Sequence, residues 1–110
     1  MFEIHGNDLY ISRGEATVLN ITPRNEDGTV YELDPLEYLE LRIRDKISGS
    51  LVRSIRTNFG STEFKINAKD TQHLRGNFAY SVRLVFADNS HKTIIGETPT
   101  NQPSFYVLEG

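Results

Sequence analysis

The sequence contains no cysteine. This absence excludes a disulfide framework, a thiolate zinc site and a cysteine nucleophile. Because small secreted domains commonly carry disulfides, it also favours an intracellular origin. No run of about 18 apolar residues is present, the length that a membrane-spanning helix needs. The first residues, MFEIHGND, do not have the pattern of a signal peptide.

An excess of basic residues is missing too. The chain has 12 Lys and Arg against 15 Asp and Glu, a formal net charge of −3. This balance argues against general binding to nucleic acid or to anionic membranes. The hydrophobic content of 37% is somewhat low, so few apolar positions are spare. With one hydrophobic pattern over 110 residues, we expect a single domain, 1–110.

The motifs of common active sites are absent from the sequence. His5, His73 and His91 are widely spaced and belong to no HExxH or H-x-H pattern. Surface histidines are therefore the favoured interpretation, and a histidine site assembled in space is the alternative. No GxSxG nucleophile turn and no glycine-rich phosphate loop occurs. The acidic segment Asn25–Gly28 lacks the ligand spacing of a calcium loop and predicts a hairpin turn. We expect no enzyme, no bound metal and no cofactor.

The stretch from Gly76 to Asp88 organises the chain. Its large apolar residues alternate with small or polar ones, as on a strand with one buried face. The inward set is Phe78, Tyr80, Val82, Leu84 and Phe86. The following residues, Asp88-Asn89-Ser90, predict a turn that leads into a partner strand at 91–95.

The rest of the chain predicts an all-β domain of about seven to nine short strands with almost no helix. Strands are expected at 9–11, 15–22, 29–33, 38–45, 51–57, 63–66, 76–88, 91–95 and 104–108, with short helical turns at 35–37 and 67–74 and a tail at 96–103. Such spacing is typical of a two-sheet sandwich with Greek-key connections. A small barrel is the alternative.

Charge is segregated along the chain. Every charged residue between 26 and 40 is acidic, whereas those between 42 and 56 are basic except Asp45. One interpretation is a solvated sheet face whose charges are neutralised by neighbours. The other is an electrostatic interface, in which acidic and basic patches of separate copies meet head to tail. The candidate interface residues are Glu32, Asp34, Glu37, Glu40, Arg42, Arg44, Arg53 and Arg56.

Several aromatic residues lie near strand ends or in loops, namely Tyr10, Tyr31, Tyr38, Phe59 and Tyr106. Aromatic rings at such positions commonly cover the ends of a small core. The alternative is a contact surface for a carbohydrate or a protein.

Four motifs carry a resemblance to a known family: Arg13-Gly14-Glu15, Glu26-Asp27-Gly28, Ala68-Lys69-Asp70-Thr71 and the run from Gly76 to Asp88. In these stretches the chain resembles structural domains of phages and prophages, such as the N-terminal domain of baseplate upper proteins and related tail-associated proteins. The resemblance implies an immunoglobulin-like antiparallel β-sandwich.

The resemblance also implies a function. It predicts a non-enzymatic structural or assembly domain of a phage or prophage particle, located in the virion or in the cytoplasm of the bacterial host. The expected partners are proteins, either further copies of this chain or other phage structural proteins, and neither nucleic acid nor membrane. The alternative is an adhesin-like binding module that recognises a glycan or a surface protein through its loop aromatics.

Overall fold

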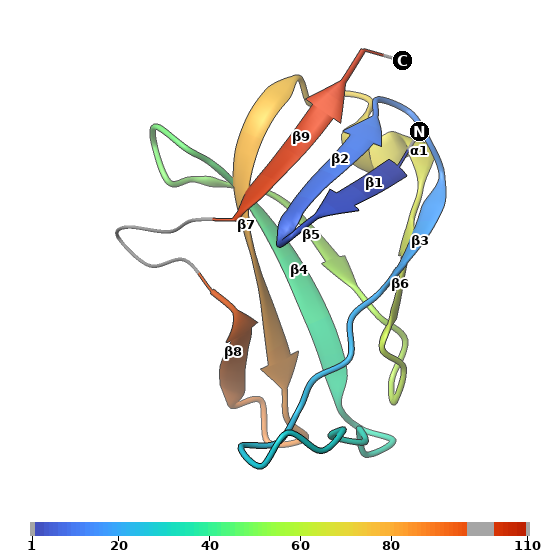
Figure 1. Cartoon of the computed structure of the whole chain (residues 1–110), viewed down its shortest axis with the longest axis vertical. Helices are drawn as coiled ribbons and strands as arrows, with labels where there is room; N and C mark the ends of the chain where they lie inside the picture. The colour runs from blue at the N-terminus through green and yellow to red at the C-terminus, as the bar shows by residue number, and fades with distance from the viewer. Residues whose placement is uncertain (1, 97–102, 110) are drawn as a thin grey trace.

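The computed structural model describes residues 2–96 and 103–109. Over this part of the chain there are nine strands and one short helix (Figure 1). The elements are β1 (Phe2–His5), β2 (Asp8–Ser12), β3 (Thr17–Asn20), β4 (Tyr38–Asp45), β5 (Leu51–Arg56), β6 (Glu63–Ile66), α1 (Ala68–Thr71), β7 (Gly76–Val85), β8 (His91–Ile95) and β9 (Ser104–Leu108). The all-β prediction is confirmed.

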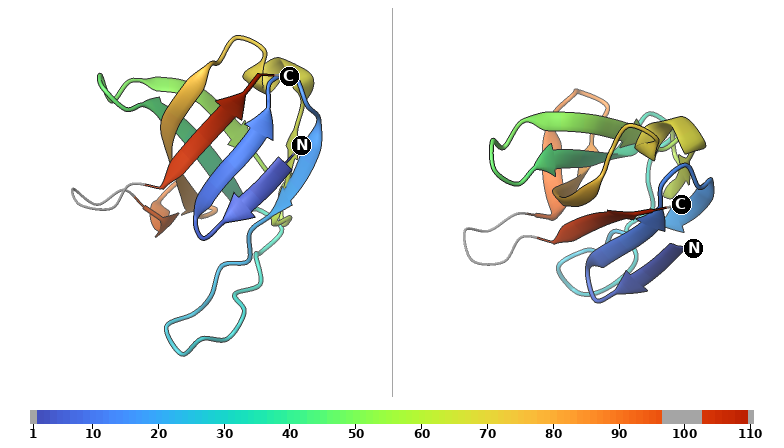
Figure 2. Two further views of the ribbon diagram at one scale, coloured as in Figure 1. Left: turned by 45° about the horizontal axis from the view of Figure 1, so that its top comes forward. Right: turned by 90° about the horizontal axis from the view of Figure 1, so that it is seen from above.

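One large sheet forms most of the molecule. Its strands follow the order β1-β2-β9-β7-β4-β5, and β8 also pairs with β7. β3 and β6 form a separate antiparallel pair. Viewed from above, β1, β2 and β9 lie on one side and β4 and β5 on the other, with β3 and β6 closing a third side (Figure 2). The large sheet therefore curls around its core.

The large sheet is mixed rather than antiparallel. β2 and β9 pair in parallel, with Leu9 opposite Phe105. The predicted antiparallel architecture is wrong at this pair. A short turn makes neighbouring strands antiparallel, but β2 and β9 come from opposite ends of the sequence, where no turn fixes their direction. The finer prediction, an immunoglobulin-like sandwich with Greek-key connections, stays a prediction.

The pairing of β4 with β7 builds the centre of the core. The ladder runs without a break from Tyr38 opposite Val85 to Asp45 opposite Phe78. The side chains that alternation assigns to the inner face are buried: Leu39, Leu41 and Ile43 on β4, and Phe78, Tyr80, Val82 and Leu84 on β7. Phe86 lies just beyond β7 and is half-buried. The predicted period of the central strand is confirmed.

Local sequence patterns predicted several other elements correctly. The predicted strands at 38–45, 63–66, 91–95 and 104–108 match the observed bounds. The turn after β7 is present, and Asn89 has a φ of 70° there. The predicted helical turn contains α1, where Asp70 Oδ2 accepts a hydrogen bond from the backbone N–H of Asn67 at 2.7 Å.

The predictions are wrong for two whole strands, and two other predicted strands are too long: 15–22 against β3 at 17–20, and 76–88 against β7 at 76–85. The segment 29–33 forms only an isolated bridge, between Arg24 and Val30. Across this bridge the Tyr31 N–H donates to the carbonyl of Pro23 at 2.9 Å, but Pro23 has no N–H to donate in return, so the ladder does not extend. The sequence prediction also missed β1. This strand has only four residues, and buried and exposed side chains do not alternate along it. Most of the predicted tail at 96–103 lies outside the described residues.

The same substitution at two valines, one predicted to face the core and one to face solvent, tests the assignment of strand faces. Val82 on β7 is fully buried, whereas Val18 on β3 is 52% exposed. We expect Val82→Ala to lower the free energy of unfolding by about 2–3 kcal/mol, because it leaves a cavity in the core. Val18→Ala should change it by less than about 0.5 kcal/mol. Urea denaturation of both variants measures this, and equal losses would contradict the assignment of faces.

Candidate functional site

The outer face of β5, β4 and β7 gathers most of the sequence-predicted basic residues. Because β4 alternates, the neighbours of its buried leucines point away from the core. Register then places Arg83 and Arg56 on either side of Glu40. We call this set the arginine face: Arg42, Arg44, Arg56 and Arg83 with Glu40. Four guanidinium groups against one carboxylate leave a formal charge of +3.

Glu40 is the centre of this face. Its side chain is 8% exposed. Oε1 accepts hydrogen bonds from Arg83 Nε at 2.5 Å and from Arg42 at 3.4 Å, and Oε2 accepts one from the Ser54 hydroxyl at 2.8 Å. Burial acts to raise the pKa of Glu40, but the Ser54 hydroxyl and the Arg83 guanidinium outweigh it, so the pKa is lowered. The negative charge of Glu40 is therefore neutralised by arginines of the same chain.

An aromatic cluster adjoins the arginine face where β4 begins. The Arg56 guanidinium carbon lies 4.9 Å from the centre of the Tyr38 ring, a cation–π contact. The rings of Tyr38 and Phe59 meet edge to face with centres 5.7 Å apart. Leu36 and Phe59, on adjoining turns, are 66% and 67% exposed. We call Leu36, Tyr38, Arg56 and Phe59 the Tyr38 cluster.

The two turns that carry these exposed side chains are tied together. The N–H of Gly60 donates a hydrogen bond to the carbonyl of Glu37 at 2.7 Å. Gly60 has a φ of 76°, a conformation that glycine adopts without strain. The position of Phe59 is thus fixed relative to β4, even though its ring faces solvent.

Arg53 does not join the arginine face. It lies opposite Ile43 and shares the inward phase of β5. Its guanidinium reaches Asp70 of α1, with Nε and one terminal nitrogen at 2.9 and 2.5 Å from Oδ1. Asp70 therefore caps the helix with one oxygen and holds β5 with the other. Arg44 does lie on the arginine face and donates to the carbonyl of Gly49 at 3.1 Å.

The sequence-predicted acidic residues separate into two groups. Glu37 is buried, and its Oε1 accepts hydrogen bonds from the Tyr31 hydroxyl at 2.7 Å and from the backbone N–H of Asp34 at 3.0 Å. The bond to Glu37 and burial raise the pKa of Tyr31 to about 12. Glu32 and the Asp34 side chain are exposed. Together with the buried Glu40, this leaves the loop acids as the ones open to a partner, and the predicted interface stays a prediction.

Sequence reasoning missed Arg83 and Ser54, which complete the network of Glu40. Arg83 occupies an outward position of the central strand, so its exposure was predictable. Its position beside Glu40 was not, because the pairing of β7 with β4 joins residues that are 43 apart in the sequence. Only the register of a non-local ladder identifies such a neighbour.

The described part of the chain contains no group of three or more His, Cys, Asp or Glu side chains placed to hold a metal ion. Among the same residues, every buried side-chain nitrogen or oxygen has a hydrogen-bond partner. No helix over residues 2–96 and 103–109 is long and apolar enough to cross a membrane. Comparisons with protein-family models, with curated proteins and with solved structures give no match.

The network of Glu40 predicts a pH dependence of stability. The folded-state pKa of Glu40 is below the usual 4.5, so its charge stabilises the fold above that pH and this contribution is lost as pH falls through the folded pKa. We expect Glu40→Gln to cost about 2–3 kcal/mol at pH 7, because Arg83 loses its charged partner. The cost should shrink at a second, acidic pH below the lowered pKa of Glu40, where its carboxyl group is protonated in the folded chain.

Urea denaturation at both pH values measures this difference. Glu63→Gln is the matched control, because Glu63 is exposed on β6 and makes no ion pair among the described residues. Acid effects from Asp27, Asp45 and Asp88, whose pKa values are also lowered by local hydrogen bonds, occur in every variant and cancel. An equal cost of Glu40→Gln at both pH values would contradict the role of its charge.

Proposed function

We propose that this chain is a non-enzymatic structural domain of a phage or prophage particle, of the tail- or baseplate-associated kind, with an immunoglobulin-like architecture. It acts by binding other proteins, either further copies of itself or other structural proteins of the particle. The resemblance of residues 13–93 to such domains supports this function. The all-β fold is compatible with it.

The observation that carries a protein-binding role is the Tyr38 cluster. Leu36 and Phe59 expose about two thirds of their surface to solvent beside the stacked pair of Tyr38 and Arg56. Tyr, Phe and Arg are enriched in protein–protein interfaces and in their hot spots. The cluster is also held by the bond between Gly60 and Glu37, so little ordering is needed on binding.

The distribution of charge favours one orientation of the proposed contact. The arginine face is positive, whereas the exposed acids Glu26, Asp27, Glu32 and Asp34 lie on the loop between β3 and β4. Two different surfaces of opposite charge favour a head-to-tail contact between copies, which closes into a ring when the rotation permits. A partner with an acidic surface would satisfy the same arginines.

A second candidate function is an adhesin-like module that binds a glycan or a surface protein through loop aromatics. The exposed ring of Phe59 favours it, since rings on loops form stacking platforms. Tyr31 supports it less, because its hydroxyl is already bonded to Glu37. The two candidate functions differ in whether copies of the chain bind one another.

Light scattering over a tenfold concentration range tests self-assembly. We expect an oligomer at low salt that dissociates at about 0.5 M salt, where charges are screened beyond a few ångströms. The double variant with Arg56→Glu and Phe59→Ala should be monomeric throughout, because it reverses one charge and removes the exposed ring. Lys65→Glu, on the exposed side of β6, makes the same change in charge elsewhere and should assemble normally.

Two outcomes would contradict self-assembly through the Tyr38 cluster. A wild-type chain that stays monomeric at every concentration, and that binds immobilised glycans with a signal lost in Phe59→Ala, would replace assembly by glycan binding. A salt-sensitive oligomer that forms equally well in the double variant would show that the contact lies outside the Tyr38 cluster.

A further inference from the structure

The curled sheet leaves an open side. β1, β2 and β9 cover one half of the β4–β7 pair, whereas the other half lies between β8 and the extended chain that follows β3 (Figure 1). In the part of the chain that the structure describes, β8 pairs with β7 alone. One edge of β8 therefore has no strand partner among the described residues.

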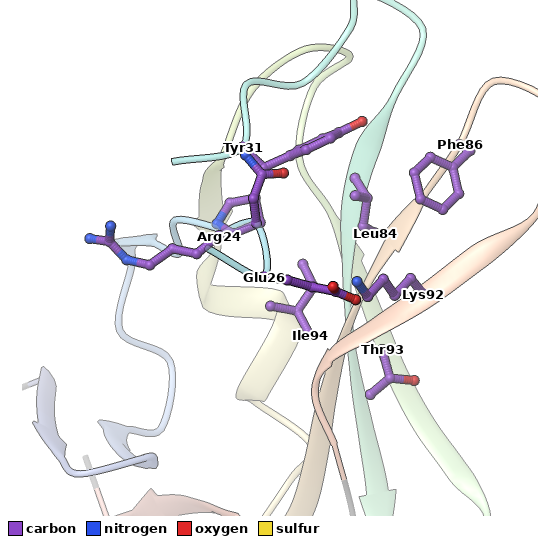
Figure 3. Close-up of a pocket in the computed structure, with 10 residues that line it drawn as sticks. Arg24, Glu26, Tyr31, Leu84, Phe86, Lys92, Thr93 and Ile94 are labelled. Carbon is purple, nitrogen blue, oxygen red and sulfur yellow. The ribbon is translucent and has the colours of Figure 1, made fainter. Parts of the chain in front are cut away.

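A cleft of about 280 Å³ lies on this side of the molecule. Leu84, Phe86 and Ile94 contribute apolar side chains to it, and the loop around Arg24, which also carries Glu26 and Tyr31, forms the opposite wall (Figure 3). A second hollow of about 200 Å³ is lined by Leu19, Ile21 and Ile95 among others. Since Ile94 and Ile95 are consecutive on β8, the two hollows border the same strand. Apolar surface thus follows β8 for its last residues.

The free edge of β8 offers backbone groups next to this surface. At the start of the hairpin, the N–H of Phe86 donates to the carbonyl of Ser90 at 2.8 Å. Hydrogen-bonded pairs alternate in an antiparallel ladder, so Lys92 opposite Leu84 bonds to β7. By the same alternation, the backbone N–H and C=O groups of His91 and Thr93 point to the free edge. Thr93 itself lines the cleft.

The rim of the cleft is positively charged on balance. Arg24 and Lys92 contribute two cations, against the single carboxylate of Glu26. Arg24 donates to the carbonyl of Gly28 at 3.0 Å. Lys92 has no hydrogen bond or ion pair to any residue that the structure describes. An acidic group on a ligand would therefore find, beside the apolar floor, an ammonium group that no described residue pairs with.

We propose that this cleft binds an extended strand of a partner protein, one that carries an acidic residue and an apolar residue on the same face. The strand pairs with the free edge of β8, places its apolar side chain over Leu84 and Ile94, and directs its carboxylate to Lys92. Backbone pairing supplies affinity and the pocket supplies selectivity, as in other cases of strand addition. The inference concerns a surface other than the arginine face and does not rest on the assembly role.

NMR titration of the ¹⁵N-labelled chain with synthetic hexapeptides tests the proposal. The probe is acetyl-TETLTV-amide, whose Glu, Leu and Val share one face, and the matched control is acetyl-TKTLTV-amide. We expect the acidic peptide to shift the backbone amides of β8 and of residues 23–26, with binding at least about tenfold tighter than that of the basic peptide.

Two variants locate the site. Thr93→Pro removes a free-edge N–H and keeps the bonds of Lys92 to β7, so it should abolish the shifts while the chain stays folded. Lys92→Met should weaken binding of the acidic peptide about three- to tenfold and abolish its advantage over the basic one. Lys65→Met, on β6, is the matched control for charge and should bind as the wild type does.

Several results would overturn the proposal. One is the absence of shifts up to about 5 mM peptide, a concentration that detects even weak strand addition. Another is an affinity that Lys92→Met leaves unchanged, a test that holds even if Thr93→Pro fails to fold. A third is concentration-dependent broadening of the β8 resonances without peptide, lost in Thr93→Pro. It would identify a second copy of this chain, rather than a partner strand, as the occupant.

Discussion

The ladder between β4 and β7 is the constraint on which the rest of the structure depends. It joins eight consecutive residues of β4 to eight of β7 in one register. That register turns Leu41 and Val82 into the core and brings Glu40 beside Arg83 on the outer face. A slip of one residue would exchange the two faces, exposing the apolar set and burying guanidinium groups. The apolar pattern and the ion pair therefore specify the same register.

The same ladder decides how the charged residues of the sequence are used. The acidic residues between 26 and 40 and the basic residues between 42 and 56 look like two opposed patches when the chain is read in order. In the folded chain, Glu40 neutralises part of the basic face, Asp70 engages Arg53, and Glu37 supports the turn before β4. What remains open to a partner is a smaller surface: several guanidinium groups, exposed loop acids and the Tyr38 cluster. Local neutralisation therefore accounts for Glu40, Asp70 and Glu37, whereas an external contact stays a prediction for the residues that remain exposed.

Much of the fold was predictable because its signals are local. Alternation identified β4, β6 and β7, and turn residues such as Asn89 located the hairpin between β7 and β8. Besides β1 and the segment 29–33, what the sequence did not predict was non-local. Neither the parallel pairing of β2 with β9 nor the meeting of Arg83 with Glu40 leaves a signal in a neighbouring stretch of sequence. The candidate site was predicted in part for the same reason: its residue types were identified, whereas their partners depend on register.

The length of β7 explains why the curled sheet has an open side. β7 has ten residues, and two shorter strands share its second edge: β9 pairs with residues 76–79 and β8 with residues 82–85. Beyond β9 the sheet continues through β2 to β1, so these three strands cover the first half of β7. β8 has no further neighbour among the described strands, so the second half receives a single strand and the flank of Leu84 and Ile94 borders a cleft. A barrel closed around both halves would need one more strand beside β8, and the cleft marks the place where that strand is missing from the described chain.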